Sequence, residues 1–271
     1  MKLEVSIVNN METFLLCPPD YFTVEYSINP WMIGEKIDIS LARYQWKNLC
    51  DTIRHAGGKV KIINPVKGLP DMVFSANSGI VHKKSIVMSR MKHKERQGET
   101  VHYRSWFISE GYNVIDLMPG ISFEGCGDSL VYNNTIIGGY GFRSDKKSLE
   151  IAASTLGLNL YSLELSDPRF YHLDTCFCRV SRDKAIYFPD AFKKGEIKKL
   201  QGVIDLIPVS GEDARLFMCN SMLVDDILLI PEGQTELGKK LRNELGIKTC
   251  TVNVSEFLKS GGSIQCLCLK I

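Results

Sequence analysis

The sequence predicts an α/β fold in which five similar units form a closed ring. Five helical segments are each expected to end at a glycine, and these glycines recur about 44 to 54 residues apart, which indicates an internally repeated architecture. A short apolar strand, a polar loop and a second strand follow each glycine, so five equivalent loops would face one central cavity. The glycines are Gly57, Gly111, Gly157, Gly202 and Gly246.

The first unit illustrates the pattern. Residues 11–34 are expected to be irregular because their prolines exclude a helix. A helix is predicted for Ile39–His55, Gly57 and Gly58 end it, and a strand, Val60–Ile63, follows. The apolar residues that recur at helical spacing are Ala42, Trp46, Leu49 and Ile53.

The same order of elements recurs to the end of the chain. The last run, Ser263–Ile271, is short and apolar and predicts a buried strand, with Cys266 at the junction of loop and strand just after Gly261 and Gly262. The strands predicted after the other four glycines are Val114–Leu117, Leu158–Leu163, Val203–Ile207 and Ile247–Val252.

An open stack of repeats with ordinary polar turns is the structural alternative to the ring. Such a solenoid needs atypical caps at both ends, and none stands out in the sequence. Uncapped sheet edges would be a liability, so the closed ring is favoured.

The composition is that of an ordinary globular protein, with 44% apolar and 24% charged residues among 271. We treat residues 1–271 as one domain. The net charge of +2 and the interspersed charges argue against a nucleic-acid or membrane partner. No signal peptide or long apolar stretch is evident. We therefore expect a cytoplasmic protein that binds a small molecule, and a homo-oligomer stays open.

The nine cysteines are an odd number and are scattered along the chain, which indicates reduced thiols. There is no C-x-x-C pair, and the two C-x-C pairs have no histidine at ligand spacing beside them. The sequence therefore predicts no metal site.

The polar loops together carry the groups that guanidinium chemistry requires. Carboxylates match the fixed fork of guanidinium donors, a thiolate can attack the guanidinium carbon, and an imidazole can protonate the departing nitrogen. The loop residues are Cys266, His172, Asp71, Glu124, Asp174, Asn77 and Asn220.

Each of these residues also has a purely structural interpretation. A cysteine usually just packs, Asp71 after Pro70 could be a turn residue, Glu124 a solvated charge and His172 a core histidine. Their recurrence at equivalent points of a repeat favours the functional interpretation.

The motifs around these residues resemble those of the amidinotransferase and guanidine-hydrolase superfamily, the pentein or five-bladed α/β propeller group. The closest resemblance is to the arginine dihydrolase domain of cyanobacterial ornithine/ammonia-cycle enzymes, and it covers nearly the whole chain. It implies five ββαβ units around a central pocket and no metal or organic cofactor. The motifs lie at residues 17–19, 29–32, 71–77, 93–99, 123–128, 139–143, 172–175 and 261–266.

The resemblance also implies roles for individual residues. Cys266 would be the nucleophile, and His172 the general acid and base with Glu124 beside it. Asp71 and Asp174 would accept hydrogen bonds from the guanidinium. The remaining implied substrate contacts are Arg96 and Arg143 on the α-carboxylate, Asn29 from the N-terminal segment, and the amides Asn77 and Asn220.

Asn77 distinguishes among the relatives. Deiminases and dimethylaminohydrolases of the group place an aspartate there, whereas the arginine dihydrolases resemble this chain in carrying asparagine. An amide can still hydrogen-bond a neutral ureido group, which would favour a second hydrolysis. The expected reaction converts arginine to ornithine, carbon dioxide and two ammonia molecules.

Other functions stay open. Dimethylarginine dimethylaminohydrolase, which acts on methylated arginine, and arginine deiminase both stop at citrulline. A ribosome-binding factor of the same fold lacks the thiol and the histidine, so the presence of Cys266 and His172 argues against a non-catalytic role.

Overall fold

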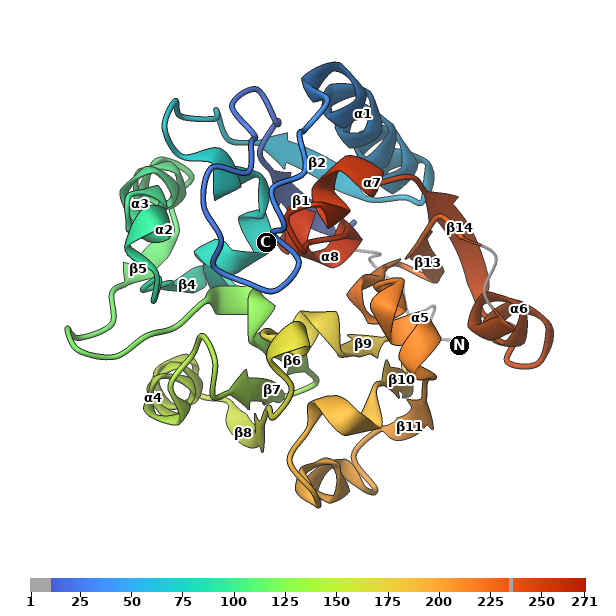
Figure 1. Cartoon of the computed structure of the whole chain (residues 1–271). Coiled ribbons are helices and arrows are strands. Elements are labelled where there is room, and N and C mark those ends of the chain that lie inside the picture. Colours follow the sequence, from blue (N-terminus) through green and yellow to red (C-terminus); the bar gives the residue numbers. More distant parts are fainter. Residues whose placement is uncertain (1–10, 234–235) are drawn as a thin grey trace, which may run out of the picture.

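Five three-stranded sheets are arranged around a central axis in this computed structural model, which describes residues 11–233 and 236–271 (Figure 1). In four sheets, two consecutive strands pair antiparallel and the third joins parallel after a crossover. The strands, in chain order within each sheet, are β3 (Gly79–His82), β4 (Ser85–Met88) and β5 (Asn113–Ile115); β6 (Ser129–Tyr132), β7 (Thr135–Tyr140) and β8 (Asn159–Glu164); β9 (Phe177–Arg179), β10 (Lys184–Tyr187) and β11 (Asp205–Pro208); β12 (Met222–Val224), β13 (Ile227–Pro231) and β14 (Lys248–Val252).

The fifth sheet closes the ring with strands from both ends of the described chain. β15 (Leu269–Lys270) pairs antiparallel with β1 (Thr13–Leu16), and β1 pairs parallel with β2 (Lys59–Ile62). The predicted closed ring of five ββαβ units is therefore confirmed, and the solenoid is excluded.

Helices on the outside of the ring form the crossovers. α1 (Ile39–His55) has the predicted bounds. Asp38 caps its N-terminus by accepting a hydrogen bond from Leu41 N at 3.0 Å, and Gly57 follows it at φ +93°. Three further crossovers are α3 (Glu99–Ser109), α4 (Lys146–Leu156) and α6 (Glu236–Asn243). The remaining helices are short: α2 (Lys94–Gln97), α5 (Gly211–Arg215), α7 (Ser255–Leu258) and α8 (Ile264–Leu267).

The inner face of α1 is packed as the sequence predicts. Ala42, Leu49 and Ile53 are fully buried, and Trp46 packs against the same apolar cluster. Burying each of the larger side chains stabilises the fold by about 1.5–3 kcal/mol. The cluster includes Cys266, so the outer helix and the inner ring share one core.

Three predicted elements were wrong in detail. Residues 11–34 were expected to be irregular, but Thr13–Leu16 is a strand. Its pairing with β2 and β15 supplies hydrogen bonds that the local sequence does not reveal. The segment before Gly202 is a 3₁₀ helix, Glu196–Leu200. Residues 264–267 form the single helical turn α8, and only Leu269–Lys270 forms a strand.

A single helical turn precedes the first strand of each unit. The turns contain or adjoin the predicted polar loop residues, so the ring symmetry brings five turns from distant parts of the chain to one place. They are the 3₁₀ turns Ser75–Ser78, Gly125–Gly127, Leu173–Thr175 and Met218–Asn220, and α8.

Candidate active site

Cys266 lies in α8 with its thiol held between two neighbouring turns. Its Sγ is 3.1 Å from Asp174 Oδ2 and 3.1 Å from Asn220 Nδ2. The other end of the Asn220 amide accepts hydrogen bonds from the backbone N–H groups of Ser263 and Cys266, at 3.1 and 3.2 Å. Asn220 thus joins the turn that carries the thiol to the rest of the ring, and both ends of its amide are occupied by protein groups.

Glu124 anchors a second group of side chains. Its Oε2 is 2.8 Å from His172 Nε2 and 2.9 Å from Arg143 Nη1. Burial by itself would raise the pKa of Glu124, but Arg143 and His172 outweigh burial and hold that pKa below its ordinary value. Glu124 is therefore ionised at neutral pH, and its contact with Nε2 orients the imidazole.

Arg96 orients Asn77. The Arg96 guanidinium donates through Nη1 to Asn77 Oδ1 at 2.8 Å and through Nη2 to the Asp71 carbonyl oxygen at 3.1 Å. Glu99 accepts from Nε and Nη2 at 2.9 and 2.8 Å, which fixes the guanidinium in place. Because Asn77 Oδ1 is occupied, its NH₂ group is turned the other way.

Two buried polar atoms of the site have no protein partner among the described residues. They are a donor, Asn77 Nδ2, and an acceptor, Asp174 Oδ1. Buried polar atoms are nearly always hydrogen-bonded, so these two are suited to contact a bound ligand. Gly127 makes room for the Asn77 amide and the imidazole, since a Cβ at Gly127 would lie 2.3 Å from Asn77 Nδ2 and 3.0 Å from His172 Nδ1.

The N-terminal segment covers this site. The segment containing residues 20–38 crosses the front of the ring in Figure 1. Tyr26 donates its hydroxyl to Asp71 Oδ2 at 2.9 Å, and Asn29 Nδ2 donates to the Ser260 carbonyl at 3.1 Å. Arg143 Nη2 donates to the Ile28 carbonyl at 2.8 Å. The segment is thus tied directly to residues of the site.

The cavity that remains beneath the segment holds only about 10 Å³, so the site is closed in this structure. The structure therefore brings together the predicted site residues, but four of them do not line this cavity and reach it only through their neighbours: Glu124, His172, Asp174 and Asn220. The lining residues are Ile28, Asn29, Met32, Asp71, Phe74, Asn77, Arg96, Arg143, Tyr171, Ser260 and Cys266.

The sequence interpretation missed three residues of the site. Tyr26 bonds to Asp71, and Glu99 holds Arg96. The Tyr171 ring lies 4.6 Å from the Arg143 guanidinium, and its hydroxyl donates to the Gly261 carbonyl at 2.8 Å. Glu99 and Tyr171 lie within or beside the motifs already singled out, whereas no local signal distinguishes Tyr26.

The thiol is protonated in the unliganded site. Burial and the adjacent Asp174 carboxyl raise the pKa of Cys266 well above its ordinary value. The neutral thiol is a poor nucleophile, and a cation bound next to it would lower that pKa. A cation bound in the cavity would therefore increase the fraction of thiolate at Cys266.

We expect iodoacetamide to alkylate Cys266 slowly at pH 7 in the free protein and faster as the pH is raised, because only the thiolate reacts. Half-exposed Cys250 is the internal control and should be alkylated first. Peptide mass spectrometry over a time course measures both. Alkylation of Cys266 as fast as that of Cys250 at pH 7 would contradict the assigned protonation state.

In the part of the chain that the structure describes, no three His, Cys, Asp or Glu side chains are grouped as they would be around a metal ion. Over the same residues, no helix is long and apolar enough to cross a membrane.

Comparisons with known proteins agree on one family. Residues 21–271 match the family described as N,N dimethylarginine dimethylhydrolase, eukaryotic. The bifunctional arginine dihydrolase/ornithine cyclodeaminase ArgZ of Synechocystis sp. is 41% identical over 95% of this chain and 37% of its own length. The N(G),N(G)-dimethylarginine dimethylaminohydrolase of Mycobacterium tuberculosis is 37% identical over 95% of this chain and 85% of its own. This chain thus spans just over a third of ArgZ.

Solved structures show the same fold. The N-terminal domain of ArgZ bound to product has a TM-score of 0.93 and 40% identity, covering 96% of this chain and 97% of that one. A variant of that domain covalently bound to a reaction intermediate has a TM-score of 0.92 with the same identity and coverage. A dimethylarginine dimethylaminohydrolase adduct with S-methyl-L-thiocitrulline, 18% identical, has a TM-score of 0.81 and covers 96% of this chain and 100% of that one.

Proposed function

Since this chain belongs to the N,N dimethylarginine dimethylhydrolase family, we propose that it hydrolyses the guanidino C–N bonds of arginine through a covalent adduct on Cys266. The products are ornithine, carbon dioxide and two ammonia molecules. The observation that carries the choice of reaction is the orientation of Asn77. Arg96 occupies its oxygen, and its NH₂ group has no partner among the residues that the structure describes.

Substrate binding uses both ends of arginine. The acceptors Asp71 and Asp174 bind the guanidinium, whose charge lowers the pKa of Cys266. Arg96 and Arg143, which line the cavity, face the α-carboxylate. Asn29 closes the site with the rest of its segment, and Asn220 positions the thiol through its four hydrogen bonds.

The first round replaces one nitrogen of the guanidinium by oxygen. Cys266 Sγ attacks the guanidinium carbon, His172 delivers a proton to the departing nitrogen, and ammonia leaves a thiouronium adduct. His172, oriented by Glu124, then takes a proton from water. The water oxygen bonds to the same carbon, the C–S bond breaks, and citrulline is formed.

The second round acts on citrulline before it leaves. A guanidinium is a donor only, so a fixed NH₂ group has nothing to bond on it, whereas the ureido oxygen of citrulline is an acceptor for Asn77 Nδ2. Attack by Cys266 releases the second ammonia and leaves a thiocarbamate. Water resolves the thiocarbamate to the carbamate of ornithine, which loses carbon dioxide. Two waters are consumed per arginine.

Conversion of methylated arginine to citrulline is the second candidate. It is favoured by the Mycobacterium tuberculosis relative, 85% of which this chain covers at 37% identity. The same thiol and imidazole would release dimethylamine in a single round. Incubation with arginine, dimethylarginine and citrulline, with mass-spectrometric identification of products, distinguishes the two. Turnover of dimethylarginine with no ornithine from arginine would select the second candidate.

Asn77→Asp tests the assignment of the second round. The wild-type protein should release about two ammonia molecules per arginine, whereas Asn77→Asp should accumulate citrulline with a ratio near one, because a carboxylate cannot donate to the ureido oxygen. Ammonia and citrulline are measured in parallel, and Asn134→Asp on the exposed β6–β7 turn is the matched control. A wild-type ratio near one with citrulline accumulating would show that the protein is a deiminase.

A further inference from the structure

A second and much larger cavity lies along the axis of the ring. The inner strands lead away from the active-site turns, and residues of β1, β3, β6, β9, β12 and β15 line it. It encloses about 400 Å³, which is within the range of small-molecule sites. The active-site cavity and this axial cavity share no lining residue.

The walls of the axial cavity combine apolar surface with positive charge. Phe14, Leu173, Phe177, Met222 and Leu223 supply apolar surface. Three cationic side chains line it, and Asp174 is the single acidic side chain among the described lining residues. The cations are Lys83, Arg179 and Lys270.

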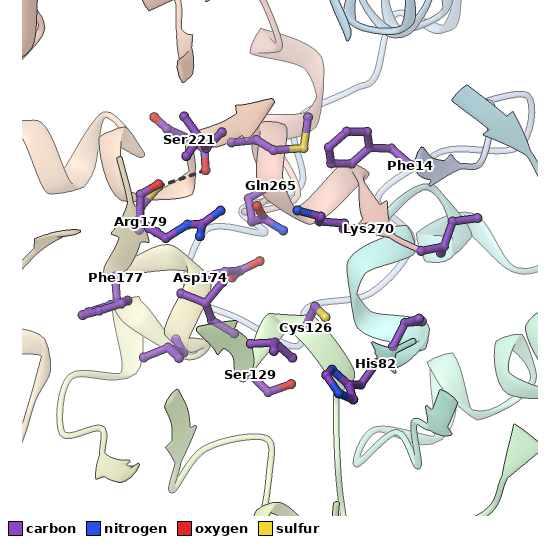
Figure 2. A pocket seen from close by; sticks show the side chains of 18 of the residues that line it. Phe14, His82, Cys126, Ser129, Asp174, Phe177, Arg179, Ser221, Gln265 and Lys270 are labelled. Carbon is purple, nitrogen blue, oxygen red and sulfur yellow. Dashed lines mark hydrogen bonds between the residues drawn. The ribbon is translucent and has the colours of Figure 1, made fainter. Parts of the chain in front are cut away.

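Two of these cations lack a counter-ion within the described residues. Arg179 on β9 and Lys83 in the β3–β4 turn form no side-chain hydrogen bond or ion pair there, whereas Lys270 bonds to Glu12. Figure 2 shows the Arg179 guanidinium, the Gln265 amide and the Lys270 ammonium directed into the same space. An anion at this point would meet donors from two separate sheets.

The inner end of the cavity adjoins the catalytic thiol. Asp174 lines the cavity, is 5% exposed, and has its Oδ2 3.1 Å from Cys266 Sγ, while its Oδ1 has no partner within residues 11–233 and 236–271. Gln265 immediately precedes Cys266 in α8. An occupant of the axial cavity would therefore lie against two residues that set the position and charge of the thiol.

We propose that the axial cavity is a second ligand site, which binds a small organic carboxylate with an apolar body and thereby slows the reaction at Cys266. The carboxylate lies between Arg179 and Lys270, beside the Gln265 amide, and the apolar body packs against Phe177 and Met222. Added negative charge beside Asp174 disfavours the thiolate, so turnover falls while arginine binding on the other side is little changed. The effect on turnover and the use of ornithine to fill the active site rest on the proposed function, whereas the dependence of binding on Arg179 does not.

Binding is tested with isovalerate, 4-methylvalerate and phenylacetate, using the Cys266→Ala protein with ornithine at saturation so that the active site is filled. Calorimetry should show at least one of the three binding, and isovaleramide, which lacks the charge, should not bind. Arg179→Gln and Lys270→Gln should each weaken that binding about tenfold or more. The matched control is Lys84→Gln, because Lys84 points to the Glu110 carbonyl and the Tyr112 ring and not to the cavity.

The kinetic arm uses the wild-type protein with arginine. The ligand found above should lower kcat with KM little changed, and the effect should disappear in Arg179→Gln, whose melting temperature is checked against the wild type. Absence of binding by all three acids at 10 mM overturns the proposal. Binding that ornithine displaces, or that Arg179→Gln leaves unchanged, also overturns the proposal. The added acid would then occupy the place of the arginine α-carboxylate in the active site. If binding is seen but arginine is not turned over, the proposed function fails and the site stands.

Discussion

Cys266→Ser is expected to lower kcat with arginine by about a thousandfold or more, since a hydroxyl is a far weaker nucleophile than a thiolate at neutral pH. The substitution removes little volume, and Asn220 and Asp174 can hydrogen-bond a serine hydroxyl where they now contact the thiol. Arginine binding should therefore persist while turnover is lost. Calorimetric titration with arginine and a coupled ammonia assay measure the two separately.

Two other cysteines serve as controls for this substitution. Half-exposed Cys250→Ser should keep both activity and stability. Cys268→Ser should keep activity but melt at a lower temperature, because Cys268 is fully buried in the apolar cluster next to α8 and a hydroxyl there lacks a partner. Substantial activity in Cys266→Ser would refute the covalent mechanism.

Arg143→Ala is expected to raise KM for arginine roughly ten- to a hundredfold, the effect of losing a charge-assisted contact. Because Arg143 also donates to Glu124 Oε2 at 2.9 Å, the variant leaves a buried carboxylate with one donor fewer. The pKa of Glu124 should rise, His172 should be less well oriented, and kcat should fall as well. Steady-state kinetics of the variant give both parameters.

Agmatine separates the two roles of Arg143. Agmatine lacks the α-carboxylate, so the wild-type protein should process it poorly, and Arg143→Ala should add little further loss in KM with this substrate. Arg104→Ala, which removes an exposed arginine paired with Asp116 on the outer surface, is the matched control and should change neither parameter. Wild-type turnover of agmatine as fast as that of arginine would show that the carboxylate contact is misassigned.

The sequence by itself determined the repeat and the residue types of the site. A glycine in the left-handed backbone conformation ends a helix through local geometry alone. Gly57, Gly111, Gly157 and Gly246 adopt this conformation, so their spacing in the sequence predicted the length of the repeat and the strand that follows each of them. The five predicted strands after these glycines and Gly202 differ from the observed ones by no more than a few residues. Helix α1 was predicted with its bounds because its apolar stripe and the glycines that follow it are local features.

Tertiary structure decided the elements that depend on distant partners. β1 exists because β2 and β15 pair with it. Residues 264–267 form a helical turn because Asn220, from another unit, accepts hydrogen bonds from the backbone N–H groups of Ser263 and Cys266. An apolar run of this length predicts a strand equally well, since its periodicity cannot show such a partner.

The orientation of side chains in the site was likewise beyond the sequence. Asn77 could be recognised as an amide in place of a carboxylate, but only the contacts of Arg96 and Glu99 show which end of the amide is left for a ligand. Tyr26 reaches Asp71 from a segment 45 residues away that has no repeat counterpart. The sequence thus determined which chemical groups meet at the centre of the ring, and packing between units decided their directions, because hydrogen-bond geometry depends on contacts that no local pattern encodes.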